Sequence, residues 1–252
     1  MECGRTMRIY AIGDIHGHLA KLREAHDLIA EDRGATGDPA AEVVHVGDLV
    51  DRGPDSRGVI DFLMDGIARG EPWVALKGNH DRMFEGFLGD PDHYDPGLRA
   101  GLHWTDPRLG GGETLLSYGV AGAGERMLFD LHDDAVQAVP EAHRRFVRGL
   151  ALMHRAGDLV FVHAGVRPGV PLDRQAEDDL LWIRREFLED TRDHGGLVVH
   201  GHTPVDAVTH YGNRLNLDTG AGYGRALSVV VIEDGAVWQL TTSGRVEVRP
   251  AR

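Results

Sequence analysis

The feature that most restricts the fold is the alternation of short apolar runs with amphipathic segments in the first third of the chain. Apolar runs at residues 8–12, 43–46 and 73–76 have the length of β-strands. Between them, residues 19–30 and 56–68 carry apolar side chains at helical spacing. A strand–helix–strand–helix–strand order predicts parallel strands whose faces are covered by helices. The sequence therefore indicates an α/β fold.

The rest of the chain changes character twice. Residues 82–150 are rich in Gly, Pro, His and Asp, with amphipathic patterns at 112–118 and 141–150. We expect this segment to form a mostly helical insertion over one end of the sheet. One more helix is expected at 177–188. Strands are expected at 158–162, 197–200, 206–210, 214–217, 226–232 and 236–241. These strands predict a second, largely antiparallel sheet packed on the first.

The chain contains no internal repeat and no Pro/Gly/Ser-rich linker. We therefore expect residues 1–252 to form a single domain, in which 82–150 is an insertion. Residues 1–6 precede Met7 and the first predicted strand, and we expect them to form a disordered extension.

Composition excludes several classes of function. The 27 Lys and Arg against 40 Asp and Glu give a net charge of −13, which argues against nonspecific nucleic-acid binding. No stretch approaches the roughly 18 consecutive apolar residues of a membrane span. No apolar secretory region follows the N-terminus, so a cytoplasmic location is expected. Cys3 is the single cysteine, which excludes a disulfide framework and a thiolate zinc cluster.

Five of the predicted strands run directly into clusters of polar residues. The clusters are Gly13-Asp14-Ile15-His16-Gly17, Gly47-Asp48-Leu49-Val50-Asp51-Arg52-Gly53, Gly78-Asn79-His80-Asp81, His163-Ala164-Gly165 and His200-Gly201-His202-Thr203-Pro204. In open α/β sheets, ligands bind at the carboxyl ends of the strands. We therefore expect these five clusters to converge on one site.

Each cluster also has an ordinary structural explanation. Asp14 can belong to a turn with a solvated His16, Asp51 and Arg52 can form a surface ion pair, and Asn79 can cap a helix. Five clusters at the same topological position make these explanations jointly improbable. Three further histidines near the clusters are expected to be structural or supporting, namely His18, His45 and His200.

Six side chains of the clusters are suited to metal binding. They are Asp14, His16, Asp48, Asn79, His163 and His202. Two carboxylates, one amide and three imidazoles provide enough ligands for two divalent cations that share one carboxylate. Oxygen and nitrogen ligands suit Mn, Fe or Zn. Two close metals are the usual apparatus of in-line phosphoryl transfer, and Arg52 adds a planar cation that can grip a phosphate.

The five motifs, in this order, resemble those of the phosphoprotein phosphatase family, and most closely its bacterial and bacteriophage serine/threonine phosphatases. The resemblance extends over residues 8–232. It implies a calcineurin-like metallophosphoesterase fold, in which two packed mixed β-sheets are flanked by helices and 82–150 forms a helical cap. Gly110-Gly111-Gly112, Trp182-Ile183-Arg184 and Asp218-Thr219-Gly220-Ala221 also resemble segments of the family.

The resemblance implies a division of the metal ligands. Asp14 and His16 would hold one metal, and Asp48 would bridge the two. Asn79, His163 and His202 would hold the second metal. A hydroxide that bridges the metals would attack phosphorus in line. The expected cofactors are two divalent ions per chain, with Mn²⁺ as the first choice and Fe or Zn as alternatives.

The resemblance also implies roles for four other residues. Arg52 and Arg184 would bind the phosphoryl oxygens and stabilise charge in the transition state. His80 would protonate the leaving group, and Asp51 would orient His80. Asp81 stands where many members of the family carry Glu.

The main functional expectation is a phosphomonoesterase that acts on phosphoserine, phosphothreonine or phosphotyrosine, with a phosphoprotein or phosphopeptide as partner. The alternative is a hydrolase of dinucleoside polyphosphates such as diadenosine tetraphosphate. That branch tends to carry a small residue at the position of Asp51, which favours the phosphatase. A nuclease or phosphodiesterase typically ends its last motif in Gly-His-x-His, and here Pro204 occupies the second His position. A non-catalytic binding protein is disfavoured because every predicted ligand and His80 are present. The sequence specifies neither the substrate nor the oligomeric state.

Overall fold

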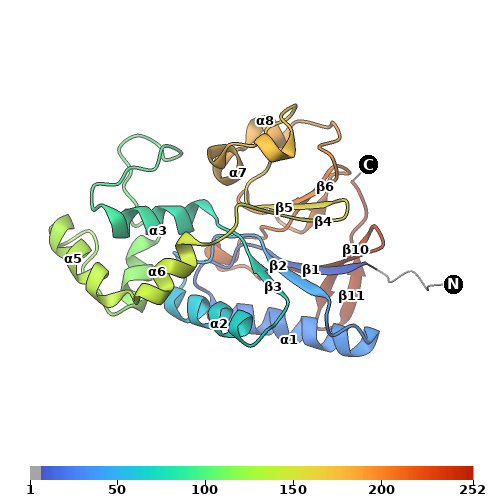
Figure 1. Ribbon diagram of the computed structural model, residues 1–252, viewed down its shortest axis with the longest axis horizontal. Coiled ribbons are helices and arrows are strands. Elements are labelled where there is room, and N and C mark those ends of the chain that lie inside the picture. Colours follow the sequence, from blue (N-terminus) through green and yellow to red (C-terminus); the bar gives the residue numbers. More distant parts are fainter. Residues whose placement is uncertain (1–6, 252) are drawn as a thin grey trace.

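The fold consists of two β-sheets that pack on each other and carry helices on their outer sides (Figure 1). The computed structural model describes residues 7–251, so the extension expected at 1–6 lies outside the described residues. α1 (Leu19–Thr36) and α2 (Ser56–Ala68) cover the first sheet, and α7 (Glu177–Trp182) and α8 (Arg185–Leu188) cover the second. The predicted arrangement of two mixed sheets flanked by helices is confirmed.

The first sheet has the strand order β11-β10-β9-β1-β2-β3. Its strands β1 (Arg8–Ile12), β2 (Glu42–His45) and β3 (Trp73–Ala75) are parallel, as predicted. β9 (Val229–Glu233) pairs antiparallel with β1, and β10 (Ala236–Thr241) and β11 (Gly244–Glu247) extend the sheet.

The placement of these last strands corrects our expectation, which assigned them to the second sheet. β9 is apolar on both faces. Val229 and Val231 pack in the core under the helices, whereas Val230 and Ile232 pack in the core between the sheets. A strand that is buried on both faces requires a central position in a covered sheet, and the edge of β1 provides it.

The second sheet has the order β4-β5-β6-β8-β7. It contains β4 (Met153–Ala156), β5 (Leu159–Val162), β6 (Leu197–His200), β7 (Thr209–His210) and β8 (Arg214–Asn216). We expected a largely antiparallel sheet, and this was wrong for its centre. β5, β6 and β8 are parallel, while β4 and β7 are antiparallel edge strands. The reason is the long segment with α7 and α8 between β5 and β6, because parallel neighbours need such a crossover.

The core between the sheets follows the period of two expected for strands. In β1, Ile9 and Ala11 belong to the cluster between the sheets, together with Phe161 of the second sheet. Tyr10 and Ile12 point to the opposite side and belong to the cluster under the helices. The turn after β1 therefore begins from a buried segment, and the turns after the parallel strands carry the polar clusters.

The segment 82–150, which we call the cap segment, combines helices with long turns, and residues 90–110 contain no helix. It contains the end of α3 (Asn79–Gly89), followed by α4 (Gly111–Ser117), α5 (Leu128–Ala138) and α6 (Glu141–Arg148). These helices lie together at one end of the sheets in Figure 1. That 1–252 form a single domain remains a prediction.

The helix expected at 177–188 is interrupted. α7 ends at Trp182 and α8 begins at Arg185, because Ile183 and Arg184 leave the helical conformation, with Arg184 at φ −130° and ψ −94°. The interruption exposes Arg184, one of the two arginines predicted to bind phosphate. Among residues 7–251, no helix is both long enough and apolar enough to cross a membrane.

Candidate metal centre and active site

The five polar clusters meet at the carboxyl ends of the parallel strands. Asp14 follows β1, Asp48 follows β2, and Asn79 begins α3, the first helix after β3. His163 and His202 follow β5 and β6 of the second sheet. All six predicted metal ligands are buried, with exposed fractions between 0% and 6%. The structure therefore brings together, from both sheets, the side chains that the sequence singled out.

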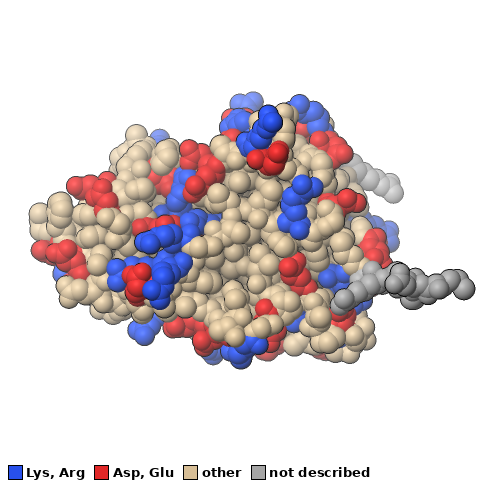
Figure 2. Space-filling view, in the orientation of Figure 1, with Lys and Arg blue, Asp and Glu red and all other residues tan. Residues whose placement is uncertain are grey.

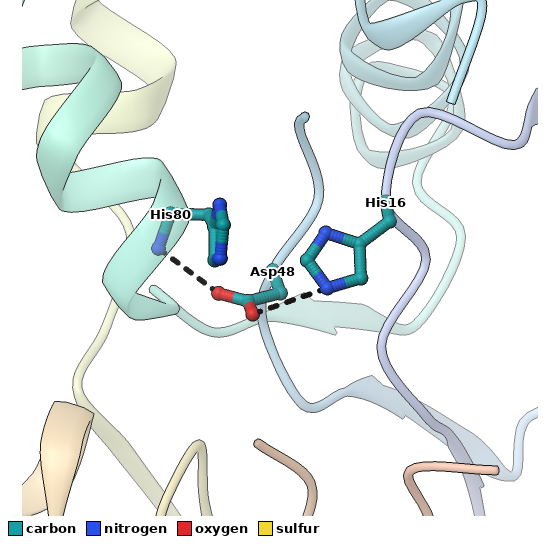
Figure 3. Close-up of side chains that lie close together, drawn as sticks. All are labelled: His16, Asp48 and His80. Atoms are coloured by element: carbon teal, nitrogen blue, oxygen red, sulfur yellow. Dashed lines mark hydrogen bonds and ion pairs between the residues drawn. The ribbon is translucent and has the colours of Figure 1, made fainter. Parts of the chain in front are cut away.

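Asp48 occupies the centre of this cluster (Figure 3). Its Oδ2 lies 3.4 Å from Nε2 of His16, and its Oδ1 lies 3.3 Å from Nε2 of His163. The backbone N–H of His80 donates to the same Oδ1 over 3.0 Å. Asp48 thus belongs to two groups of potential ligand atoms, one with His16 and His80 and one with His163 and His202. A carboxylate shared between two groups is what a bridging ligand requires.

The imidazoles are held in the tautomer that suits metal binding. Nδ1 of His16 lies 3.0 Å from the carbonyl of Val50, and Nδ1 of His163 lies 3.0 Å from the carbonyl of Val46. A carbonyl can only accept, so each Nδ1 carries the proton and each Nε2 presents a lone pair to the centre. Burial lowers the pKa of both imidazoles, which keeps them neutral and able to bind a cation.

Asn79 lies beside His163 and His202 of the second group, and one potential ligand atom from each of these three residues is in close contact. Nε2 of His163 lies 2.9 Å from Oδ1 of Asn79 and 3.2 Å from Nδ1 of His202. Nδ1 of His202 also lies 2.9 Å from Oδ1 of Asn79. The amide oxygen has only lone pairs to offer, and the two nitrogens offer lone pairs when they carry no proton. A divalent cation would satisfy all three together.

Asp14 is adjacent to these groups but not a member of either. Its Oδ2 accepts from the backbone N–H of His202 over 2.9 Å, while its buried Oδ1 has no partner among the described residues. A Cβ on Gly201 would lie only 1.8 Å from that oxygen, so glycine is required there. An unpaired buried carboxylate oxygen is costly, and a cation would compensate for this cost. The residues present therefore fit a site for divalent metals.

The two central carboxyls differ in their electrostatics. Burial raises the pKa of Asp14 well above its usual range, and the carboxyls of Asp218 and Asp48 raise it further. Burial would also raise the pKa of Asp48, but electrostatic attraction to His163, His80 and His16 in their protonated form lowers it well below its usual range. Asp48 is therefore the carboxylate that stays ionised among the neighbouring rings.

The backbone of the site is strained. Among residues 7–251, six residues other than glycine have positive φ, and five of them lie in the clusters. These five are His16, Asp48, Asp51, Arg52 and His202. Such conformations cost of order 1–3 kcal/mol each and persist only where surrounding contacts enforce them. The strained turns direct these side chains inward from the ends of the strands.

His80 and Asp51 form the predicted pair. Nδ1 of His80 donates to Oδ2 of Asp51 over 2.7 Å, and Nε2 of His80, on the other side of the ring, accepts from NH2 of Arg52 over 3.1 Å. Two further donors to Asp51 come from the cap segment: Nε1 of Trp104 at 2.8 Å and Oγ1 of Thr114 at 2.7 Å. Sequence reasoning did not assign Trp104 or Thr114 to the site.

The two predicted phosphate-binding arginines lie at different ends of the cluster. NH1 of Arg52 lies 2.7 Å from Nε2 of His16, and the guanidinium of Arg52 packs over the ring of Tyr223 at 4.6 Å. Arg184 is exposed and donates to Oγ1 of Thr203, directly after His202. The first arginine therefore borders the His16 end, and the second borders the His202 end.

Two further buried carboxyls support the site. Asp81 accepts the backbone N–H groups of Leu49, Val50 and Gly78, so it joins the loop after β2 to the start of α3. Asp218 is buried nearby, and burial raises its pKa to about 6. Asp218 heads one of the family-like segments, and this was the available signal for it. Thr114 had only the preceding glycine run, and Trp104 had no signal.

A separate cavity of about 550 Å³ lies between α3 and α6, where Lys and Arg gather on the surface in Figure 2. Its cations are already paired: Lys77 donates to Glu85 over 2.8 Å, and Arg82 to Asp95 over 2.7 Å. None of the six predicted metal ligands lines this cavity. The candidate active site is therefore located by the convergence of potential ligands rather than by the size of a cavity.

Comparisons with known proteins agree with this geometry. The sequence profile described as calcineurin-like phosphoesterase matches residues 7–231. The asymmetrical bis(5'-nucleosyl)-tetraphosphatase PrpE of Geobacillus thermodenitrificans is 26% identical over 248 residues, covering 89% of this chain and 90% of that protein. The serine/threonine-protein phosphatase 1 of Salmonella typhimurium is 27% identical over 240 residues, covering 92% and 95%.

A solved structure shows the same fold. The cold-active protein-tyrosine phosphatase of a psychrophilic Shewanella species superposes with a TM-score of 0.61 at 15% identity, over 96% of this chain and 80% of that one. The predicted calcineurin-like metallophosphoesterase fold is thereby confirmed. The family match extends over most of the chain and contains all five polar clusters, so the chain belongs to the calcineurin-like phosphoesterase family.

Proposed function

We propose that this metallophosphoesterase hydrolyses dinucleoside tetraphosphates, with two divalent cations held by the six clustered ligands. The observation that carries the proposal is the position of two arginines at different ends of the ligand cluster. Arg52 contacts His16, and Arg184 contacts Thr203 beside His202. A tetraphosphate chain carries several negative charges along its length. Two guanidinium groups at these positions can each bind phosphate oxygens of such a chain.

The similarity to bis(5'-nucleosyl)-tetraphosphatases supports the same substrate class. Our main expectation from the sequence was a protein phosphatase, and the relatives favour the alternative. The sequence argument for a phosphatase was based on Asp51, because the dinucleotide hydrolases tend to carry a small residue at that position. Its contacts with His80, Trp104 and Thr114 concern proton delivery and leave the identity of the bound phosphate open.

The roles follow from the positions of the side chains. Two divalent cations, when bound, supply an activated water and neutralise charge on the phosphate. Asp48 would contact both of them. Arg52 and Arg184 would bind the phosphate oxygens on either side of the bond to be cleaved. Nε2 of His80 would deliver a proton to the departing oxygen, and Asp51 would hold the proton on Nδ1.

Phosphomonoester hydrolysis on phosphoproteins is the second candidate. The pair of His80 and Asp51 favours it, because an alkoxide leaving group needs a proton more than a nucleotide does. The Salmonella phosphatase, which aligns over nearly its whole length, adds similarity to this class. The two candidates share the ligands and differ in the leaving group.

A direct comparison of substrates tests the proposal. The full chain is loaded with Mn²⁺, and in parallel with Zn²⁺ or Fe²⁺, and kcat/KM is measured on diadenosine tetraphosphate and on a phosphoserine peptide. We expect kcat/KM to be at least about tenfold higher on the dinucleotide. Chromatography of the products separates cleavage into two ADP from cleavage into ATP and AMP. A higher kcat/KM on the phosphopeptide would reject the proposal in favour of the second candidate.

A pair of neighbouring variants tests the arginine argument. Arg184→Gln removes a charge beside Thr203, whereas Arg185→Gln removes a charge paired with Glu189 on α8. Loss of a charge-assisted hydrogen bond corresponds to about a tenfold or larger rise in KM. We expect this rise on the dinucleotide for Arg184→Gln only. Equal KM values for the two variants would remove Arg184 from the site.

A further inference from the structure

The carboxylate of Asp51 is completely buried and has a donor on each oxygen. Oδ2 accepts from Nδ1 of His80 at 2.7 Å and from Nε1 of Trp104 at 2.8 Å. Oδ1 accepts from Oγ1 of Thr114 at 2.7 Å. Both oxygens are thus fixed, so the carboxylate cannot rotate without breaking a buried hydrogen bond.

Thr114 holds the backbone of Asp51 as well as its side chain. The N–H of Asp51 donates to Oγ1 of Thr114 over 2.8 Å and to Oγ of Ser56 over 3.1 Å, and these two hydroxyl oxygens lie 2.9 Å apart. Asp51 is in the left-handed region, with φ 73°, which is costly for a residue other than glycine. One hydroxyl group therefore stabilises both the strained backbone and the orientation of the carboxylate.

Trp104 and Thr114 come from the cap segment, 53 and 63 residues beyond Asp51 in the chain. The indole of Trp104 is fixed by packing on Phe84 and Phe87, at ring-centre distances of 5.5 and 4.9 Å. Gly111, at the start of α4, lies against the same indole, because a Cβ there would lie 2.6 Å from it. The cap segment thus presents a rigid donor pair to the carboxylate.

We propose that Trp104 and Thr114 are positioning residues that fix the Asp51 carboxylate, and through it the direction in which His80 Nε2 points. The proposal rests on the proposed function for the proton that His80 delivers. The ring of His80 stands at 89° to the ring of His16, with centres 4.9 Å apart, and its Nε2 lies 3.1 Å from NH2 of Arg52. Asp51 is the partner that fixes the opposite nitrogen, Nδ1. The cap segment is in this way part of the proton-delivery apparatus.

The first test uses the acidity of the leaving group. kcat is measured with p-nitrophenyl phosphate and with phenyl phosphate, because phenol is the weaker acid and needs the proton more. Thr114→Val keeps the shape of the side chain and removes the hydroxyl. We expect the ratio of kcat on phenyl phosphate to kcat on p-nitrophenyl phosphate to fall about tenfold, with KM unchanged. Thr114→Ser, which retains the hydroxyl, restores the parent ratio.

Trp104→Phe removes one donor and keeps an aromatic ring, so we expect a smaller fall of the same ratio. Its matched control is Trp73→Phe, because Nε1 of Trp73 has no hydrogen-bond partner among the described residues. We expect the control to keep the parent ratio. An equal loss of kcat on both esters in Thr114→Val would indicate a merely structural role and overturn the proposal.

A second readout is independent of turnover. In protein labelled with ¹⁵N-histidine and loaded with diamagnetic Zn²⁺, the Nδ1 proton of His80 should exchange slowly with water. We expect faster exchange in Thr114→Val and Trp104→Phe, and parent-like exchange in Thr114→Ser and Trp73→Phe. Unchanged exchange in the first two variants would refute the positioning role. If the parent hydrolyses no phosphate substrate but these exchange rates change as expected, the proposed function fails and the positioning role stands.

Discussion

Acid should destabilise the protein through the buried His45 and its partly buried partner His26. Nδ1 of His45 lies 3.1 Å from the carbonyl of Val74, which can only accept, so Nδ1 carries the proton of the neutral ring. Nε2 of His45 then accepts from Nε2 of His26 at 3.0 Å. His45 is completely buried, and this burial lowers its pKa from 6.5 to about 4. A proton on His45 would break the bond with His26.

The lowered pKa of His45 makes the free energy of unfolding depend on pH. Between pH 6.5 and about 4, the unfolded chain binds a proton at His45 and the folded chain does not. Stability is therefore fully present above pH 6.5 and is lost as the pH falls through this window. The complete loss corresponds to about 3 kcal/mol, of which about 2 kcal/mol is lost between pH 7 and pH 5.

Other buried groups also titrate in this range, so the assay compares two proteins. The free energy of unfolding is measured by urea titration at pH 7 and pH 5 for the parent and for His45→Leu, which cannot be protonated. We expect the loss on acidification to be about 2 kcal/mol smaller in the variant. Trp73→Phe is the control, because Trp73 packs on His45 at a ring distance of 6.0 Å and does not titrate. If His45→Leu loses as much stability as the parent, the reasoning from burial is refuted.

Three further predictions concern the metal centre. Asp48→Asn should lower the metal content, measured by elemental analysis, because Asp48 is shared by both ligand groups. Turnover should fall on the order of 10²–10³-fold. Near-parent metal content and turnover would together reject the bridging role. Gly201→Ala should displace Asp14 and weaken metal binding in calorimetry, because the added Cβ would lie 1.8 Å from Oδ1 of Asp14. Gly34→Ala, in open space on α1, should instead raise the free energy of unfolding by about 0.5–1 kcal/mol. Removal of metal by a chelator should abolish hydrolysis and lower the melting temperature, and Mn²⁺ should restore both; a melting temperature that is indifferent to metal would contradict a site built for cations.

The sequence was sufficient for the features that local pattern determines. Each predicted ligand follows an apolar strand by a few residues, so recognising the strand also located the ligand. The parallel order of β1, β2 and β3 followed from the helices between them. The interruption before Arg184 was not predicted, because acidic and apolar residues continue a helical pattern across it.

Features that depend on distant partners were not predictable in the same way. A short apolar strand such as β9 can pair with several edges, and its pairing with β1 depends on which edge is left open by the rest of the fold. Trp104 and Thr114 reach Asp51 only after the cap segment folds back over the strands. Nothing in the sequence around Trp104 and Thr114 marks them as site residues, because a single Trp or Thr in a Gly-rich segment is common in loops.

The pairing of β1 with β9 has a consequence for synthesis on the ribosome. Arg8 and Glu233 are partners 225 residues apart, and β1 lies between β9 and β2 in the finished sheet. At a synthesis rate of about 5–20 residues per second, β9 is made on the order of tens of seconds after β1. Until then, this edge of β1 is unpaired. During that time an apolar strand is available to other nascent chains. Chains that end before β9 would therefore be prone to aggregation and would need a chaperone, even though every predicted metal ligand has already been made.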